Sequence, residues 1–306
     1  MSNKATYIQS TLLHQCLPIF FQPWWLDIAS KDWDMILAIE NKQVLAVLPI
    51  CREKKMGFHL LRNPLLTPYL GPFFFQDADN ESFLFQELWK QMPKYDSFDI
   101  ETTTGFQYVG LFEEQGFDTK QKDTYILDLA VQTEMLYANI NSNHRNLIKQ
   151  ATTSHTIEEK PEHISTLLTL HKITFERKDK SYPFDAAVIE KLITESIQKG
   201  QGCLLSAKDQ AHHITASIFV VWDRETMYLL LSAFDINEAH QGAVRMLIWE
   251  AIKKAKALNI AYFDFEGSMD PGIAAFFRRF GGERKTYLCA SKTDSPLWKL
   301  KKKLLG

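Results

Sequence analysis

The sequence has 306 residues, of which 45% are hydrophobic and 24% are charged, and its net charge is −2. This length accommodates about two domains, each with its own core. A net charge near zero excludes a field over the whole surface that would recruit nucleic acid or an anionic membrane, so any such contact must be local. The four cysteines are widely spaced and form no CxxC pair, which is typical of reduced core thiols rather than of a disulfide framework or a metal site.

The first half of the chain predicts strands early. Residues 35–52 alternate apolar and polar side chains around the turn Asn41-Lys42 and therefore predict a β-hairpin. Residues 63–72 hold three prolines and a glycine, too many for a helix or a central strand. They predict an ordered apolar loop, which either forms a pocket wall or covers the core. A helix over 82–92 and a strand over 123–129 follow, and we expect one domain to end at residue 128 and the next to begin at residue 129.

The second half predicts a longer series of elements. In order, they are helices over 134–151, 164–178 and 186–199, a hairpin over 203–223, a strand over 226–235, a helix over 241–258, a strand over 260–266, a helix over 271–280 and a strand over 284–291. The first of these helices is expected to present a polar face with Asn143, His144, Arg145 and Lys149. This order is typical of an α/β domain with a mixed sheet.

A twenty-residue segment near the C-terminal end has a fainter copy in the first half. The segment FDFEGSMDPGIAAFFRRFGG, residues 263–282, aligns without gaps with FDIETTTGFQYVGLFEEQGF, residues 98–117, which lies 165 positions earlier (264 minus 99). Each copy predicts a buried strand, a polar turn and an amphipathic helix, so the chain is expected to hold two copies of one domain, over 1–128 and 129–306. The second copy alone carries Gly267, Ser268 and the two arginines near its end, and we expect the active site there.

The order of these elements resembles the GNAT N-acyltransferase fold. In that fold a central helix between the fourth and fifth strands lies beside the cofactor, and these two strands splay apart to admit the acyl group. Four segments are similar to those of FemABX-type proteins, which are tandem GNAT-like proteins: residues 127–129, 141–151, 242–267 and 272–283. The resemblance implies an acyltransferase that moves an acyl or aminoacyl group to an amine, in the Fem case from aminoacyl-tRNA to a peptidoglycan precursor. Synthesis of a cell-wall or surface-glycan precursor is therefore an expected setting.

The acyl donor stays open between acyl-CoA and aminoacyl-tRNA, with no tightly bound cofactor expected. Acyl-CoA enzymes of this fold carry a loop of the form Q/R-x-x-G-x-G/A, whose backbone N–H groups hold pyrophosphate at the start of the central helix. The corresponding residues 237–245, NEAHQGAVR, keep Gly242 but place Ala239 and Val244 at two of the other motif positions. The long helical hairpin of many tRNA-using Fem proteins has no counterpart here. The alternatives are an acyl-CoA-dependent N-acetyltransferase acting on an amino sugar or small amine, and a degenerate, non-catalytic binding protein.

Acyl transfer to an amine needs a base, donors for the oxyanion and a proton for the leaving group. Glu266 ends an apolar strand and is the predicted base, with a helix cap or an ion pair as its structural alternative. The other predicted catalytic residues are Ser268, Tyr228 and Arg278. The predicted cofactor-binding residues are Ser232, Gly242, Arg245 and Arg279, and the predicted substrate-binding residues are Arg145, Lys149 and Tyr287. The pair His212-His213 has no further ligand at metal spacing, so no metal is expected.

The expected partners are an amine acceptor, either a small molecule or a glycan or peptide, and the acceptor end of tRNA if tRNA is the donor; DNA is not expected. No signal peptide and no apolar run of about 18 residues is apparent, so we expect a cytoplasmic protein. The basic amphipathic tail from Trp298, WKLKKKLLG, predicts either a solvated closing helix or a weak contact with an anionic membrane surface.

Overall fold

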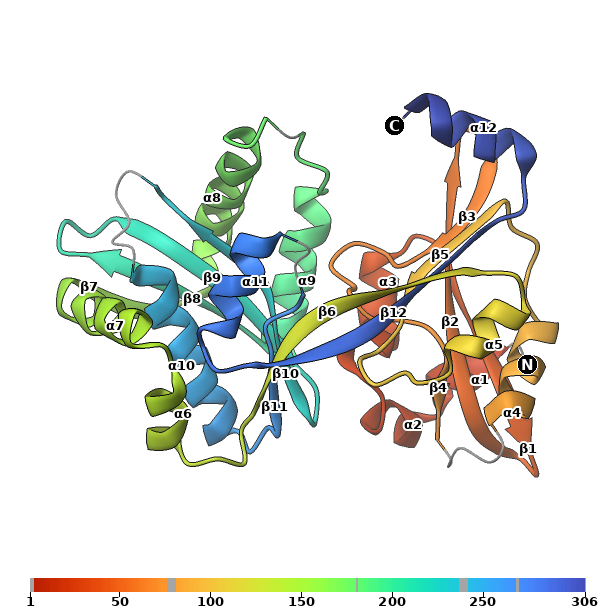
Figure 1. The fold of residues 1–306 in the computed structure, drawn as a ribbon, viewed down its shortest axis with the longest axis horizontal. Helices are drawn as coiled ribbons and strands as arrows, with labels where there is room; N and C mark the ends of the chain where they lie inside the picture. Colours follow the sequence, from red (N-terminus) through yellow and green to blue (C-terminus); the bar gives the residue numbers. More distant parts are fainter. Residues whose placement is uncertain (1–2, 76–80, 180, 237–241, 268–269, 306) are drawn as a thin grey trace. The chain divides into compact units, whose positions relative to one another are not determined.

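The computed structural model describes residues 3–75, 81–179, 181–236, 242–267 and 270–305 (Figure 1). The chain divides into two compact units, unit 1 with Met1–Lys122 and Lys285–Gly306, and unit 2 with Asp123–Arg284. Each unit combines helices with a mixed sheet, so the predicted α/β class is confirmed. None of the helices in the described ranges combines the length and the apolar composition needed to cross a bilayer.

Unit 1 is built on a sheet with the strand order β1-β2-β3-β5-β12, and β4 adds to β2. Its elements are α1 (Asn3–Gln9), α2 (Thr11–Gln15), a 3-10 turn (Ile19–Phe21), α3 (Pro23–Ala29), β1 (Trp33–Glu40), β2 (Gln43–Lys55), β3 (Phe58–Arg62), β4 (Phe73–Phe74), α4 (Glu81–Lys90), β5 (Ser97–Glu101), α5 (Val109–Glu114), part of β12 (Glu283–Thr293) and α12 (Pro296–Leu305). The expected hairpin is confirmed as β1 and β2. Its two turn residues have positive φ, 49° at Asn41 and 67° at Lys42, as a two-residue hairpin turn requires.

Unit 2 has the strand order β6-β11-β10-β9-β8-β7. Its elements are part of β6 (Asp118–Asp128), α6 (Thr133–Asn139), α7 (Ser142–Ser154), β7 (His155–Glu159), a 3-10 turn (Pro161–His163), α8 (Ile164–Glu176), α9 (Ala186–Gln198), β8 (Gly202–Asp209), β9 (Ile214–Trp222), β10 (Thr226–Phe234), α10 (Ala243–Ala257), β11 (Tyr262–Asp264) and α11 (Pro271–Arg278). The expected helix over 134–151 is two helices, because Asn141 caps α7 by accepting a hydrogen bond from the backbone N–H of Asn143 at 3.0 Å.

The helices of unit 2 cover both faces of its sheet. One core joins α7 and α10 to alternate residues of the central strands, Cys203, Leu205 and Ala207 on β8 among them. The helices α8 and α9 contact the same strands but contribute no residue to this core, so they lie on the other face. Burial on both faces explains why the middle of β8 is buried at consecutive positions rather than at alternate ones.

The two units exchange their last strands. Strand β6 follows the first repeat copy, yet its second part pairs antiparallel with β11 of unit 2, with Leu127 opposite Phe263. Strand β12 follows the second copy, yet it pairs antiparallel with β5 of unit 1, with Lys292 opposite Phe98. Phe263 lies 165 positions after Phe98, and Lys292 lies 165 positions after Leu127, so the two pairings are related by the shift of the sequence repeat.

This pairing moves the division of the chain away from residues 128 and 129. Residues 285–306 belong to unit 1 and not to the second domain in which we expected them. Backbone hydrogen bonds to β5 hold β12 there, and Leu288 and Ala290 of β12 are buried in the unit 1 core. Strand β12 thus supplies both a paired strand and core side chains to the first unit.

Candidate functional site

Strands β10 and β11 of unit 2 are parallel neighbours that separate after three residue pairs. The last pair joins Tyr228 to Asp264, where β11 ends, whereas β10 continues to Phe234. Among the described strands, none therefore pairs with this edge of β10 beyond Tyr228. The register between β10 and β9 shifts between Leu229 and Leu231 at the same place, which marks a bulge. The separation is the feature that the resemblance predicts for the acyl site.

Asp264 organises the end of β11. Its carboxyl group is buried, with 1% of the residue exposed, and its Oδ1 accepts a hydrogen bond from the Thr124 hydroxyl of β6. The same oxygen accepts the backbone N–H of Glu266 at 2.8 Å. Asp264 therefore fixes the turn that carries Glu266 and acts as a positioning residue.

The turn after β11 is conformationally restricted. Glu266 is half-buried and has a φ of 52°, a left-handed conformation that non-glycine residues adopt at a cost. Gly267 approaches β6 so closely that an ideal Cβ there would lie 1.8 Å from the carbonyl oxygen of Asp123. The side chain that caps α11 belongs to Asp270, which accepts the N–H of Gly272 at 2.8 Å, so Glu266 does not serve as that cap. Ser268 lies outside the described residues.

Tyr228 is held as a neutral phenol. Its side chain is buried beside Asp264, and its hydroxyl donates a hydrogen bond to Oδ2 of Asp223 at 3.1 Å. Burial raises the pKa of this phenol well above its ordinary value, and the nearby carboxylates of Asp223 and Asp264 raise it further. A phenol in this state stays protonated, so it can donate a hydrogen bond and does not act as an anionic nucleophile.

Gly242 begins α10 and contacts another helix. An ideal Cβ at this position would lie 2.0 Å from the carbonyl oxygen of Leu147 and 3.0 Å from the Cβ of Ala151, both on α7. The residue is buried, and helix packing alone requires it to be glycine. Residues 237–241, the remainder of the sequence segment compared with a pyrophosphate loop, lie outside the described part of the chain.

Two arginines gather near the start of α10. Nε of Arg245 donates to Nδ1 of His144 at 3.4 Å, and its guanidinium lies 4.8 Å from the ring centroid of Phe276. Burial lowers the pKa of Arg245, and the nearby charge of Arg279 lowers it further. Burial, then Arg245 and Arg279, lower the pKa of His144 to about 4, so this imidazole is neutral. The concentration of positive charge at a helix N-terminus favours an anion.

His144 itself was missed as part of the site. We expected it on the polar face of its helix, and this was wrong, because the residue is 0% exposed. It lies four and seven positions before the buried Ile148 and Ala151, on the same stripe of α7. That spacing is the signal in the sequence that indicates its burial.

The other predicted residues occupy varied positions. Ser232 is exposed on the part of β10 beyond the separation, and Arg278 is exposed at the end of α11. Lys149 is exposed on α7, whereas the guanidinium of its neighbour Arg145 donates to the carbonyls of Ala138, at 2.5 Å, and Ile140, at the end of α6. Tyr287 lies in the other unit, where it is buried with its ring centroid 5.2 Å from that of Tyr69.

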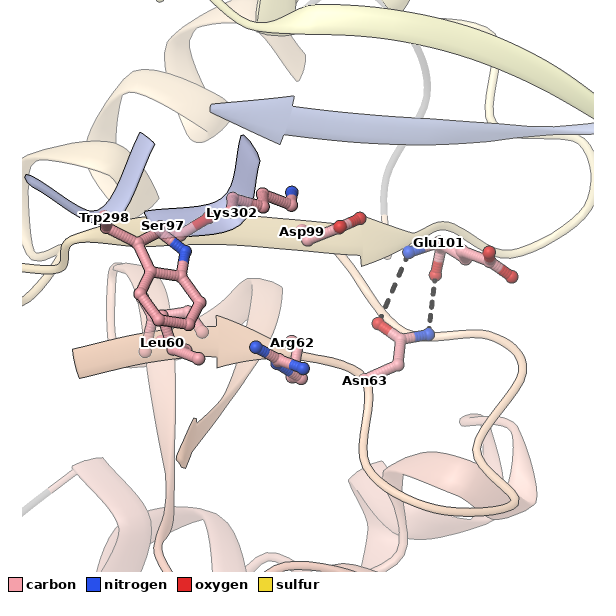
Figure 2. A pocket seen from close by; sticks show the side chains of 9 residues that line it. Leu60, Arg62, Asn63, Ser97, Asp99, Glu101, Trp298 and Lys302 are labelled. Carbon is pink, nitrogen blue, oxygen red and sulfur yellow. Dashed lines mark hydrogen bonds between the residues drawn. The ribbon is translucent and has the colours of Figure 1, made fainter. Parts of the chain in front are cut away.

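Unit 1 has the same arrangement of two parallel strands, but hydrogen bonds within the unit join the residues at the ends of these strands. Strands β3 and β5 are parallel and pair as far as Arg62 and Asp99. Figure 2 shows the next residue, Asn63, facing Glu101; its Nδ2 donates to the Glu101 carbonyl at 3.2 Å and its Oδ1 accepts the Glu101 N–H at 3.3 Å. Glu101, the copy of Glu266, also forms an ion pair with Lys122. In unit 1, the residues that follow the two strands are therefore bonded to one another and to Lys122.

A pocket of about 240 Å³ lies beside Asn63 and Glu101 (Figure 2). Its lining comprises Leu60, Leu61, Arg62, Asn63, Ser97, Asp99, Glu101, Trp298 and Lys302. The loop predicted over 63–72 thus contributes Asn63 to a pocket wall. Arg62 pairs with Glu53 at 3.1 Å, so the charges of this pocket are in part neutralised within unit 1.

The cysteines are free thiols in three environments. Cys51 and Cys203 are buried, and burial raises the pKa of each to about 12. Cys289 is half-buried, and Cys16 is exposed, which the expectation of four core thiols did not include. Within the described ranges, no three His, Cys, Asp or Glu side chains are gathered closely enough to hold a metal ion.

Comparisons with known proteins agree with this architecture. The family model of the GNAT acetyltransferase domain matches residues 136–278. Among solved structures, FemX is similar over 92% of this chain and 94% of its own, with a TM-score of 0.72 and 13% identity. The C-terminal domain of a putative lysylphosphatidylglycerol synthetase from Agrobacterium fabrum is similar over 95% of this chain and 93% of its own, with a TM-score of 0.59 and 11% identity.

A tandem GNAT protein from the clavulanic acid biosynthesis pathway is similar over 89% of this chain and 87% of its own, with a TM-score of 0.55 and 8% identity. No curated protein sequence matches this chain. The expected fold, two tandem GNAT-like domains, is confirmed.

Proposed function

Because the chain has the tandem GNAT fold of FemABX-type proteins, we propose that it is an N-acyltransferase whose active site lies in unit 2. It transfers an acyl or aminoacyl group from a phosphate-bearing donor to an amine. The observation that carries this proposal is the separation of β10 from β11, next to a turn that presents Glu266. The arginines near the start of α10 give the same unit a place for the donor's phosphates.

The reaction forms a C–N bond and breaks the C–S bond of a thioester or the C–O bond of an ester. Glu266 accepts the proton that the amine loses, and Asp264 holds the turn in position for this. Backbone N–H groups on the edge of β10 beyond Tyr228 stabilise the oxyanion. The leaving group takes up a proton in turn, and Tyr228, which stays protonated, is the proposed hydrogen-bond donor to it. Arg278 remains a second proposed donor to the reacting carbonyl.

Both candidate donors carry phosphate, so Arg245 and Arg279 suit either of them. His144 is neutral and therefore does not repel Arg245. Its Nδ1 accepts a hydrogen bond from Nε of Arg245 and so orients that side chain. We propose acyl-CoA and aminoacyl-tRNA as the two donors to compare. Synthesis of a cell-wall or surface-glycan precursor is the proposed setting if the aminoacyl donor is used.

Calorimetric titration with CoA, acetyl-CoA and a short aminoacylated RNA hairpin tests the donor. We expect one class to bind, and Arg279→Glu to weaken that binding at least tenfold, since it places a carboxylate where the phosphates would lie. Arg224→Glu is the matched control, because Arg224 is exposed at the opposite end of β10 from the separation. If neither class binds a folded sample, or if both variants lose binding equally, the arginine site is refuted.

Turnover of the bound donor with a panel of amines tests the chemistry. We expect Glu266→Gln to abolish release of the free thiol or the free RNA end while donor binding stays within about twofold. A donor that binds but is turned over with none of these amines would favour the non-catalytic binding protein over the transferase.

A further inference from the structure

The C-terminal helix α12 has two apolar sides. Trp298 is 5% exposed and packs on Phe58 of β3, with ring centroids 5.0 Å apart, and this contact fixes the helix to unit 1. Leu297, Leu300 and Leu304 recur at spacings of three and four and therefore share another face. These leucines are 70%, 59% and 79% exposed. We call them the outer leucines.

Lysines flank the outer leucines. Residues 296–304 hold four lysines and no acidic residue, although the whole chain has a net charge of −2. Lys299 and Lys303 are exposed on one side of the leucine stripe, whereas Lys301 lies on the other side, with its Nζ 5.7 Å from the Phe58 ring centroid. The positive charge is thus concentrated on one short helix, and the helix axis can lie parallel to a flat surface with the leucines directed toward it.

The turn between β2 and β3 lies near this helix. Met56 in this turn is 60% exposed, and the two residues before it, Lys54 and Lys55, are exposed as well. Phe58, two positions later, is the residue on which Trp298 packs. Figure 1 shows α12 at the end of unit 1 where β3 begins. A further exposed apolar side chain, preceded by two lysines, therefore lies at the same end of unit 1 as the helix.

We propose that this surface, the outer leucines together with Met56 and the lysines around them, docks unit 1 onto a lipid membrane that carries anionic headgroups. Leucines enter the boundary between headgroups and acyl chains, and the lysines contact lipid phosphates. The positive charge of the lysines favours an anionic membrane over the other partners that could cover this face. In a two-fold dimer built on the same face, the lysines of one copy would meet those of the other, and a nucleic acid would leave the leucines in water.

Co-sedimentation with vesicles tests the proposal. We expect the protein to bind vesicles of phosphatidylcholine mixed with phosphatidylglycerol, to bind vesicles of phosphatidylcholine alone at least tenfold more weakly, and to be released by high salt. Lys299→Gln with Lys303→Gln should weaken binding roughly twenty-five-fold, since each lysine near an anionic surface contributes about a fivefold change. Replacing the three outer leucines with serine should weaken it at least tenfold.

Matched controls come from unit 2. Lys178→Gln with Lys191→Gln removes two exposed lysines, and Met135→Ser with Ile236→Ser removes two exposed apolar side chains. Neither double variant should change vesicle binding by more than about twofold. All replaced side chains are exposed and Trp298 is retained, and near-UV circular dichroism verifies the fold.

Three results would overturn the proposal: no binding of the wild-type protein to phosphatidylglycerol vesicles, unchanged binding after loss of the outer leucines, or equal losses in the control variants. Sedimentation velocity of the protein without lipid tests the alternative that a second copy of the chain, rather than a membrane, covers this face. A dimer that dissociates when the outer leucines are replaced would mean that a second copy covers this face.

Discussion

Replacing Gly242 with alanine separates the two roles that this residue can have, helix packing and phosphate binding. An ideal Cβ at position 242 lies 2.0 Å from the Leu147 carbonyl oxygen, and real Cβ atoms essentially never come within 3.0 Å of such an atom. Helices α7 and α10 must therefore move apart by at least about 1 Å where they cross, which forfeits a quarter to a half of the affected dispersion contacts. Because the opposing atoms are backbone and cannot rotate away, we expect a loss of about 3 kcal/mol in the free energy of unfolding.

Urea unfolding followed by circular dichroism measures this loss. Gly110→Ala is the matched control, since Gly110 lies in α5 and an added Cβ there meets nothing within 4 Å. Alanine in a helix is favoured over glycine, so the control should be unchanged or more stable by up to about 1 kcal/mol. A Gly242→Ala protein with the wild-type unfolding midpoint would refute the packing argument, and simultaneous loss of donor binding would assign the glycine to phosphate instead.

Three further predictions concern unit 2. His144 has a pKa of about 4 in the folded chain against 6.5 in the unfolded chain, so the unfolded state takes up the proton first as the pH falls. The free energy of unfolding should therefore drop by about 2 kcal/mol between pH 7 and about pH 5. Most of this drop should vanish in His144→Gln. Gly267→Ala places a Cβ 1.8 Å from the Asp123 carbonyl oxygen and should lower the thermal unfolding midpoint of unit 2 by at least as much as Gly242→Ala does. Arg145→Ala leaves the α6 carbonyls without their donor and should cost about 1 to 2 kcal/mol in denaturant unfolding.

Each of these has a result that would contradict it. An equal pH response in the wild type and in His144→Gln would mean that His144 titrates normally in the folded protein. A Gly267→Ala protein as stable as Gly110→Ala would show that β6 yields to the added carbon. Unchanged stability in Arg145→Ala, with weaker binding of the amine acceptor, would support the predicted substrate role of this arginine over its contacts with α6.

Local sequence signals predicted the elements whose structure depends on neighbouring residues. The turn Asn41-Lys42 between alternating stretches was sufficient for the first hairpin, and a proline after Asp270 indicated the start of α11. The repeat indicated two copies of one domain, because the apolar positions that match between the copies pack into equivalent cores in the two units. Strand β3 was not predicted, since its five residues are stabilised by pairing with β2 and β5 rather than by any turn of their own.

The site was less predictable because its properties depend on distant partners. Asp264 accepts hydrogen bonds both from Glu266 and from Thr124, which lies 140 positions earlier in the chain. Gly242 fitted a phosphate loop by spacing, whereas its closest neighbour is a carbonyl of α7. No spacing rule indicates which carbonyl a glycine will meet, because that depends on how two helices cross.

The exchange of β6 and β12 has a consequence for the order in which the protein is made. The sheet of unit 1 needs β12, whose last residue is Thr293, so this unit stays incomplete until nearly the whole chain has left the ribosome. Until then β5 presents an unpaired edge to other nascent chains, which is a hazard for aggregation. Unit 2, in contrast, has all of its strands once β11 has emerged, because β6, which pairs with β11, precedes it in the chain. The unit that is synthesised first is therefore the last to be finished.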